Sequence, residues 1–258
     1  GWASDTEVEP PAITAEAKAT VAFAKSVALA EIPSDGCDLV AGPYVEQVRE
    51  VKGIQVATYF LPGEAADAGL WLDAAADVVA RYEPILGTYP HKKFDVVENF
   101  FSTGYGMPSF TLLGDDVIRY VTAGAKSTGK IPPGYLDHEY VHGWFGNGLF
   151  VDPADGNWCE GSTTYYSNYL AKELESPQAA VDHRRGVLEK YAIRITPEND
   201  YPVRSFATKT EDKDNDVGYG KASMVFHVLR RRLGDTEFFA RVKRLAQDRV
   251  GTYVSWDD

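Results

Sequence analysis

The sequence predicts an α+β fold in which a mixed β-sheet packed on helices precedes a helical lobe. Runs with β-type patterning end near Val121, whereas almost everything after Gly134 has helical patterning. Strands and helices that are segregated along a chain are typical of α+β folds rather than of alternating α/β folds. The 258 residues, 44% of them hydrophobic, are enough for a core that does not depend on disulfide bonds or structural metal ions for its stability.

The strands are expected in the first half of the chain. An Ala-rich segment at 15–32 is predicted to be helical. Two β-rich runs follow, 38–51 and 54–61, and Lys52-Gly53 between them has the composition of a hairpin turn.

Apolar residues recur at helical spacing after this hairpin, which predicts an amphipathic helix over 65–86. Three further strands are predicted at 93–99, 110–113 and 117–121.

The second half is expected to be helical. Ser176-Pro177 combines an N-cap residue with Pro at the first helical position. An apolar stripe from Ala222 to Leu233 stops at Gly234, and Asp235 is predicted to cap a further helix.

Composition excludes several classes of protein. The net charge is 26 − 38 = −12, which disfavours a nucleic-acid binder because such a protein needs a positive face. No apolar run is long enough to span a bilayer. Two cysteines, Cys37 and Cys159, exclude a disulfide-rich scaffold and a cysteine-based zinc finger, but leave open one disulfide or two free thiols. The cellular compartment stays open.

The segment His138-Glu139-Tyr140-Val141-His142 has the HExxH pattern. On a helix, positions i and i+4 share a face, so both imidazoles can point at one metal ion, and Glu139 can reach a water bound to that ion. The alternative is a surface helix that merely carries two histidines. The chain has only five histidines, and the presence of two of them here favours a metal site.

The third ligand distinguishes the families of zinc enzyme. A metzincin would have Gly and His where this chain has Phe145 and Gly148, so that class is excluded. Glu160 begins a second helical stretch that can fold back against the histidines. Asp152 and Asp155 are competitors, although their Pro/Gly-rich turn favours a capping role.

Several motifs together carry a resemblance to a known family. His142-Gly143-Trp144-Phe145-Gly146-Asn147 resembles the HxWxGN run of the membrane alanyl aminopeptidase family, the gluzincin metallopeptidases similar to aminopeptidase N and leukotriene hydrolase. Trp158-Cys159-Glu160-Gly161 resembles its W-x-x-E-G ligand segment, one residue shorter. Weaker matches in the same order are Gly87 to Asp95 and Tyr219-Gly220-Lys221-Ala222, and the resemblance covers roughly 54–258.

The resemblance implies a thermolysin-like zinc metallopeptidase catalytic domain acting on peptides. It implies one zinc ion per chain, bound by His138, His142 and Glu160, with Glu139 as general base. It also implies that the Tyr219 phenol stabilises the oxyanion of the tetrahedral intermediate, the charge that such donors are placed to meet. The alternative for Tyr219 is an ordinary tyrosine at the start of a core helix.

One motif departs from the family pattern. The family's G-x-M-E-N segment carries the Glu that pairs with the free amino terminus of the substrate. Here the corresponding, candidate substrate-binding residues are Gly106, Met107, Pro108 and Ser109, so Pro108 stands where that Glu should be. Strict recognition of a free amino terminus is therefore in doubt.

Residues 1–53 are expected to be a partial remnant of a preceding β domain with an N-terminal helix, and 54–258 the catalytic domain. Further domains of a longer parent protein are compatible with this division. Three functions stay open: a zinc aminopeptidase, a related zinc hydrolase without strict amino-terminus recognition, and a non-enzymatic binding module that retains the fold.

Overall fold

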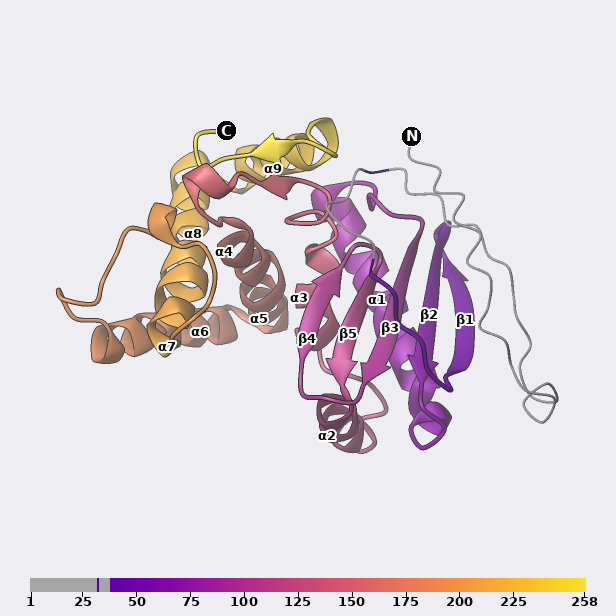
Figure 1. The fold of residues 1–258 in the computed structure, drawn as a ribbon. Helices are drawn as coiled ribbons and strands as arrows, with labels where there is room; N and C mark the ends of the chain where they lie inside the picture. Colours follow the sequence, from indigo (N-terminus) through magenta and orange to yellow (C-terminus); the bar gives the residue numbers. More distant parts are fainter. Residues whose placement is uncertain (1–31, 33–37) are drawn as a thin grey trace, which may run out of the picture.

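The computed structural model describes residue 32 and residues 38–258, and the prediction of an α+β fold is confirmed. A sheet-containing lobe lies beside a helical lobe, with helix α3 (Tyr135–Val141) between the sheet and the helices that follow it (Figure 1). The helix predicted over 15–32 lies outside the described residues, apart from residue 32.

The main sheet has the order β1-β2-β3-β5-β4. Strands β2, β3 and β5 are parallel to one another, whereas β1 and β4 are antiparallel to their neighbours. Strand β4 thus forms one edge of the described sheet. The strand bounds are β1 Val45–Val51, β2 Ile54–Phe60, β3 Lys93–Asn99, β4 Gly104–Met107 and β5 Phe110–Gly114.

The predicted hairpin at Lys52-Gly53 is confirmed. Both residues have positive φ, 51° and 79°, as the tightest hairpin turns require. The strand before the turn begins at Val45, later than the predicted residue 38.

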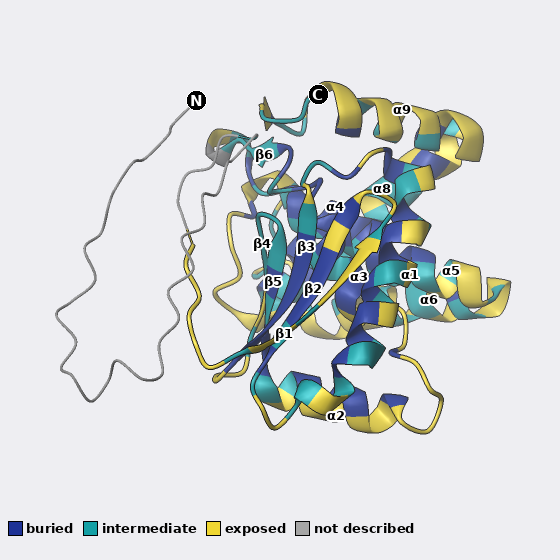
Figure 2. Cartoon of the chain, turned by 90° about the vertical axis from the view of Figure 1, so that its right-hand side faces the viewer, coloured by how far each residue is buried: buried dark blue, intermediate teal, exposed yellow. Residues whose placement is uncertain are grey.

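An aromatic cluster joins the sheet to helix α3. Tyr140 stacks on Tyr89 at a ring-centroid distance of 4.4 Å and packs edge-on against Phe94 of β3 and Trp144. These side chains are buried, and Figure 2 shows buried residues along the central strands and on the helix faces that cover them. The rigid contact fixes where α3 lies relative to the sheet.

The predicted strand at 117–121 is wrong. These residues belong to helix α2 (Asp115–Ala125), whereas the predicted helix at 65–86 is confirmed as a short 3₁₀ turn, Ala65–Asp67, followed by α1 (Ala68–Leu86). The short apolar run at 117–121 fits strand spacing as well as helical spacing, but Ile118, Val121, Thr122 and Ala125 are buried together at helical spacing. Burial of this stripe outweighs the β-propensity of the Val and Ile residues.

The helical lobe contains two π-helical segments, which often occur at functional sites. One interrupts the helix predicted from Glu160 onward, and the other precedes the predicted stripe at 222–233. The Ser176 cap is confirmed, since its hydroxyl accepts from the backbone N–H of Ala179. The bounds are α4 Cys159–Thr164, η4 (π) Tyr165–Tyr169, α5 Leu170–Glu175, α6 Pro177–Arg194, α7 Asp212–Asp214, η6 (π) Asn215–Lys221, α8 Ala222–Leu233 and α9 Asp235–Asp248.

Two short parallel strands were not predicted, β6 (Phe150–Val151) and β7 (Tyr253–Val254). They join the chain after α3 to the C-terminal segment. No helix in the described part of the chain has both the length and the apolar character needed to cross a membrane.

Candidate metal centre and catalytic cleft

Helix α3 places the two histidines of the HExxH pattern side by side. His142 follows the last turn and its backbone N–H donates to the carbonyl of His138 at 3.2 Å, so the two imidazoles share a face. Their Nε2 atoms are 3.2 Å apart. The buried carboxylate of Asp137 holds the start of this short helix by accepting from the backbone N–H of Gly134 at 2.7 Å and from the guanidinium of Arg81.

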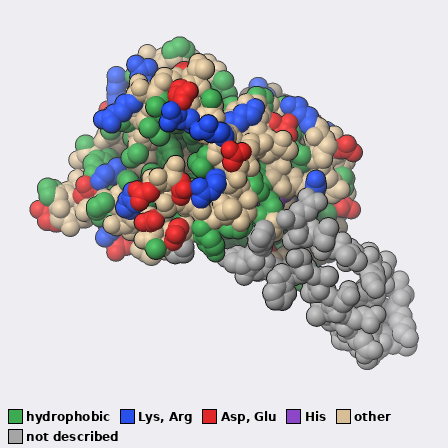
Figure 3. All heavy atoms as spheres, turned by 90° about the horizontal axis from the view of Figure 1, so that it is seen from above, with side chains coloured by type: hydrophobic (Ala, Val, Ile, Leu, Met, Phe, Trp, Pro, Cys, Tyr) green, Lys and Arg blue, Asp and Glu red, His purple; other side chains and the backbone are tan. Residues whose placement is uncertain are grey.

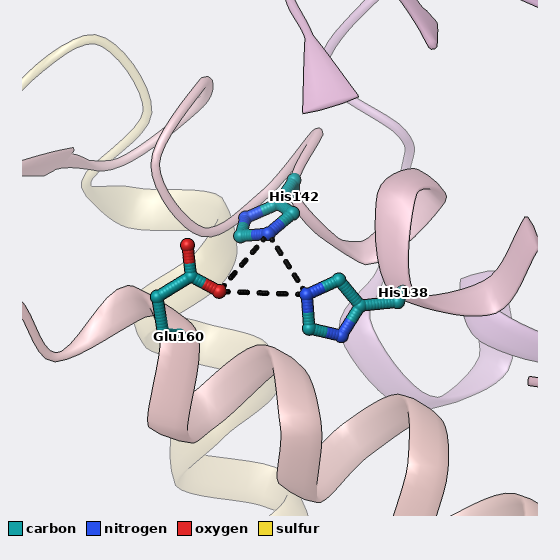
Figure 4. Close-up of side chains that lie close together, drawn as sticks. All are labelled: His138, His142 and Glu160. Atoms are coloured by element: carbon teal, nitrogen blue, oxygen red, sulfur yellow. Dashed lines mark hydrogen bonds and ion pairs between the residues drawn. The ribbon is translucent and has the colours of Figure 1, made fainter. Parts of the chain in front are cut away.

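Glu160 in the first turn of α4 completes a group of three possible ligands (Figure 4). Its Oε2 atom lies 3.4 Å from His138 Nε2 and 3.5 Å from His142 Nε2. A tetrahedral ion bound at about 2.0–2.2 Å would separate its ligands by roughly 3.3–3.6 Å, which fits these distances.

The donor set also fits a cation chemically. The Oε2 atom of Glu160 is buried, and within the described residues it has no hydrogen-bond partner. A buried carboxylate oxygen without a donor is costly unless a cation compensates it. Burial alone would raise the pKa of Glu160, but contacts with His138 and His142 outweigh it and lower that pKa.

The Nδ1 atoms of both imidazoles, which point away from the three-ligand group, have partners that orient the rings. His142 Nδ1 lies 3.0 Å from the carbonyl oxygen of Phe145, and His138 Nδ1 lies 3.2 Å from Asn168 Oδ1. Since a carbonyl oxygen only accepts, it holds the proton on Nδ1 of His142 and leaves Nε2 free to bind a metal. Asn168 comes from the π-helical segment η4, and no sequence motif pointed to it.

Glu139 faces the edge strand β4 from the opposite wall. A Cβ atom at Gly106 would lie 3.1 Å from Glu139 Oε2, and one at Gly104 would lie 3.4 Å from Glu139 Oε1. The Asn147 side chain donates to the carbonyl of Gly106 at 2.9 Å and ties the loop after α3 to this strand. The glycines of β4 therefore leave room for the carboxylate beside the metal ligands.

Tyr219 lies in the π-helical segment η6 and stands beside the histidines. Its ring is nearly parallel to that of His138, with a centroid distance of 6.4 Å and an angle of 14°. Burial, followed by the negative charge of Glu160, raises the pKa of the Tyr219 phenol. The hydroxyl thus stays protonated at neutral pH and can donate a hydrogen bond into the cleft.

One cavity of about 1020 Å³ is lined by the three possible ligands together with Glu139 and Tyr219. Gly106 and Pro108 of the predicted substrate segment line it, whereas Met107 and Ser109 are not among its lining residues. Pro108 and Ser109 form the two-residue turn between β4 and β5, and Ser109 has a φ of 71°. The lining also includes Asn147 and Lys209, together with residues that the sequence analysis did not single out for the site, among them Tyr105, Phe150, Asn157, Phe206, Thr208 and Tyr253.

The other candidates do not belong to the group of three possible ligands, although Cys159 lines the same cavity. Asp152 caps a short turn by accepting from the backbone N–H of Ala154, and Asp155 faces Arg204. Cys159 is buried with a free thiol, while Cys37 lies outside the described residues. The Nε2 atoms of His91 and His183 are buried. The ring of His227 lies against Tyr165 and Tyr169.

Comparison with known proteins gives relatives of one kind. No protein-family model matches the chain. The chain is 26% identical to mitochondrial aminopeptidase 2 of Saccharomyces cerevisiae, over 74% of this chain and 21% of that protein. It is 23% identical to human endoplasmic reticulum aminopeptidase 1, over 76% of this chain and 22% of that protein. The chain therefore spans about a fifth of the length of these curated relatives.

The fold matches solved structures of metallopeptidases. An M1 zinc metallopeptidase variant from Deinococcus radiodurans, bound to a Tyr-Ser-Ala substrate, superposes with a TM-score of 0.65 at 17% identity, covering 84% of this chain and 47% of that one. The resemblance predicted from the sequence is confirmed: the homologues of this chain are M1 aminopeptidases, and its fold is that of the M1 zinc metallopeptidases.

Proposed function

We propose that this chain is the catalytic part of a zinc-dependent peptidase with aminopeptidase-like chemistry. One zinc ion per chain would be held by His138, His142 and Glu160. The proposal rests on one observation above all: three ligand atoms converge within 4.8 Å, and one is a buried carboxylate oxygen without a hydrogen-bond donor in the described part of the chain. The names of the relatives support the same chemistry.

Each residue around the three ligands has a task in peptide hydrolysis. A bound zinc ion would supply a Lewis acid that activates water for attack on a carbonyl group. Glu139 accepts the proton from the attacking water and passes it to the leaving amine. Tyr219 donates a hydrogen bond to the oxygen on which negative charge develops, as a phenol that is protonated at neutral pH can do.

The substrate we propose is a peptide in extended conformation. Strand β4 forms an edge of the described sheet and lines the cavity at Gly104, Tyr105 and Gly106. Such an edge can pair with a peptide backbone and hold it next to Glu139. The relatives act as aminopeptidases by name, but Pro108 lacks the charge needed to bind an ammonium group, which favours a related hydrolase without strict recognition of a free amino terminus.

The division into a remnant at 1–53 and a catalytic domain at 54–258 stays part of this proposal. Within the described residues, β1 precedes the proposed boundary and pairs along its whole length with β2. The remnant would thus contribute one strand to the catalytic sheet.

The test combines metal analysis with hydrolysis. Elemental mass spectrometry of the purified protein should find zinc near one equivalent, and the loaded protein should hydrolyse short peptides with either a free or an acetylated amino terminus. Chelation should abolish hydrolysis and zinc should restore it. A zinc-loaded protein that binds peptides without cleaving them would instead support the binding module.

A further inference from the structure

A lysine lines the proposed catalytic cleft. The described residues around this cavity include two carboxylates, Glu139 and Glu160, and, besides the two histidines, one Lys or Arg side chain, Lys209. The Lys209 ammonium makes no hydrogen bond or ion pair with any described residue. Lys209 is exposed, and other cations such as Lys130 and Arg232 also lack a side-chain partner among the described residues, so what distinguishes Lys209 is its position at a cavity lined by carboxylates.

The backbone on both sides of Lys209 is held in place. Before it, the buried Phe206 packs against Tyr219 with a ring-centroid distance of 5.9 Å. After it, the buried carboxylate of Asp214 accepts from the backbone N–H groups of Thr210 at 2.7 Å and Glu211 at 2.8 Å. The segment is thus anchored at both ends, and its contact through Phe206 ties it to Tyr219.

A neighbouring lysine shows the contrast. Lys213 follows in the same segment, but its ammonium pairs with Glu211 at 3.0 Å and it is not among the residues that line the cavity. Unlike Lys213, Lys209 keeps its charge available to a molecule that enters the cleft. A cation in a cleft attracts anionic ligands and offsets repulsion by nearby carboxylates.

We propose that Lys209 binds a carboxylate of the peptide substrate, so that the cleft prefers peptides with an anionic group on the Tyr219 side. The carboxylate can belong to an acidic side chain or to the free C-terminus, and both offer the same chemistry. This inference rests on the proposed function, since it names the substrate class of that site.

Binding measurements can test the inference separately from catalysis. The zinc-loaded Glu139→Gln protein, expected to hold peptides without turnover, is titrated calorimetrically with hexapeptides. The two peptides of the first pair differ only at the C-terminus, which is a free carboxylate in one and an amide in the other. The two peptides of the second pair are both amidated and differ only in having Glu or Gln at one position. This position is moved along the hexapeptide in successive pairs. We expect the carboxylate form of at least one pair to bind about three- to tenfold more tightly, an advantage that falls with added salt.

The variants then assign the preference to one residue. Lys209→Met should reduce it to within about twofold, Lys209→Arg should retain it, and Lys213→Met, the matched control, should leave it unchanged. The inference is overturned if no carboxylate peptide binds or if no pair shows a preference for the carboxylate form. It is also overturned if Lys209→Met retains the carboxylate preference, or if Lys213→Met removes that preference equally. A carboxylate preference without hydrolysis by the zinc-loaded wild type would instead contradict the proposed function and keep the assignment to Lys209.

Discussion

Gly106 of strand β4 lies so close to His142 of the metal group that a Cβ atom on the glycine would be 2.9 Å from the Cβ atom of the histidine. Real Cβ atoms do not approach this closely, so the strand and the metal ligand fit together only because position 106 has no side chain. The edge strand β4 and the group of three possible ligands are thus in direct contact.

Gly106→Ala should therefore disturb the metal site. We expect the unfolding free energy to fall by about 1–3 kcal/mol, as in other overpacked sites, together with weaker zinc binding. The matched control is Gly104→Ala, whose Cβ atom would lie at ordinary contact distance, 3.4 Å from the Glu139 carboxylate and 4.0 Å from Leu113 Cδ2. Denaturant unfolding and zinc titration check both variants, and equal effects of the two would contradict this expectation.

Glu160→Ala should lose most of the bound zinc, because it removes the one carboxylate in the three-ligand group. Glu139→Gln should keep the metal and lose hydrolysis, since the amide cannot accept the proton of the attacking water. Metal content and activity are measured for both variants. Full retention of zinc by Glu160→Ala would mean that the third ligand lies elsewhere.

Tyr219→Phe should leave folding and zinc content intact and reduce kcat about a hundredfold, the usual loss for one oxyanion donor. The parallel ring of His138 and the burial of the phenol place this residue at the site, but only kinetics can assign its role. An unchanged kcat would return Tyr219 to a packing role. Steady-state kinetics on one peptide, with circular dichroism as the folding control, decide between the two.

The sequence allowed the three possible ligands to be predicted because their spacing follows from helix geometry. The prediction of His138 and His142 as ligands depended only on their i, i+4 relationship. The prediction of Glu160 depended only on its position at the start of a second helix. The partners that orient the rings could not be predicted in the same way. Asn168 reaches His138 through a π-helical segment, which shifts side chains away from regular helical spacing.

The fold was predictable where local patterns agree with tertiary burial. The hairpin at Lys52-Gly53 needs only its two turn residues, whereas 117–121 could be read as either strand or helix until the packing of α2 decided it. Strands β6 and β7 have two residues each and pair across a hundred positions of sequence, so no local pattern indicates them.

The pH dependence of stability should report on His91. Burial lowers its pKa to about 4, although a hydrogen bond with the backbone of Gly143 opposes this shift. Between pH 6.5 and about 4 the unfolded chain takes up a proton on this side chain and the folded protein does not. The stabilising contribution is thus present above pH 6.5 and is lost as the pH falls towards the folded pKa.

His91→Phe should remove this loss. In chelated protein, the unfolding free energy of the wild type should fall relative to the variant by up to about 1.4 kcal/mol per pH unit in this window. Chelation separates the effect from protonation of the metal ligands. Parallel pH profiles for the two proteins would show that His91 is accessible to protons in the folded state.

Recognition of a free amino terminus by this cleft should be weak. An aminopeptidase needs a negative group to meet the ammonium of its substrate, and that contact also determines where the peptide must end. Pro108 lines the cavity within the β4–β5 turn and cannot provide this charge. The Glu160 carboxylate is committed to the proposed metal site. We therefore expect free and N-acetylated peptides to differ by only tenfold to thirtyfold in kcat/KM, roughly 1–2 kcal/mol.

Pro108→Glu should increase the preference for the free amine. The ratio of kcat/KM for free and acetylated peptides is the quantity to measure, because loss of the proline can also loosen the turn and lower both rates together. Pro108→Gln is the matched control, since it removes the proline without adding charge and should leave the ratio near that of the wild type. A wild-type preference for free amino termini above about a thousandfold, equivalent to roughly 4 kcal/mol, would contradict the prediction and require another acidic group to bind the amine.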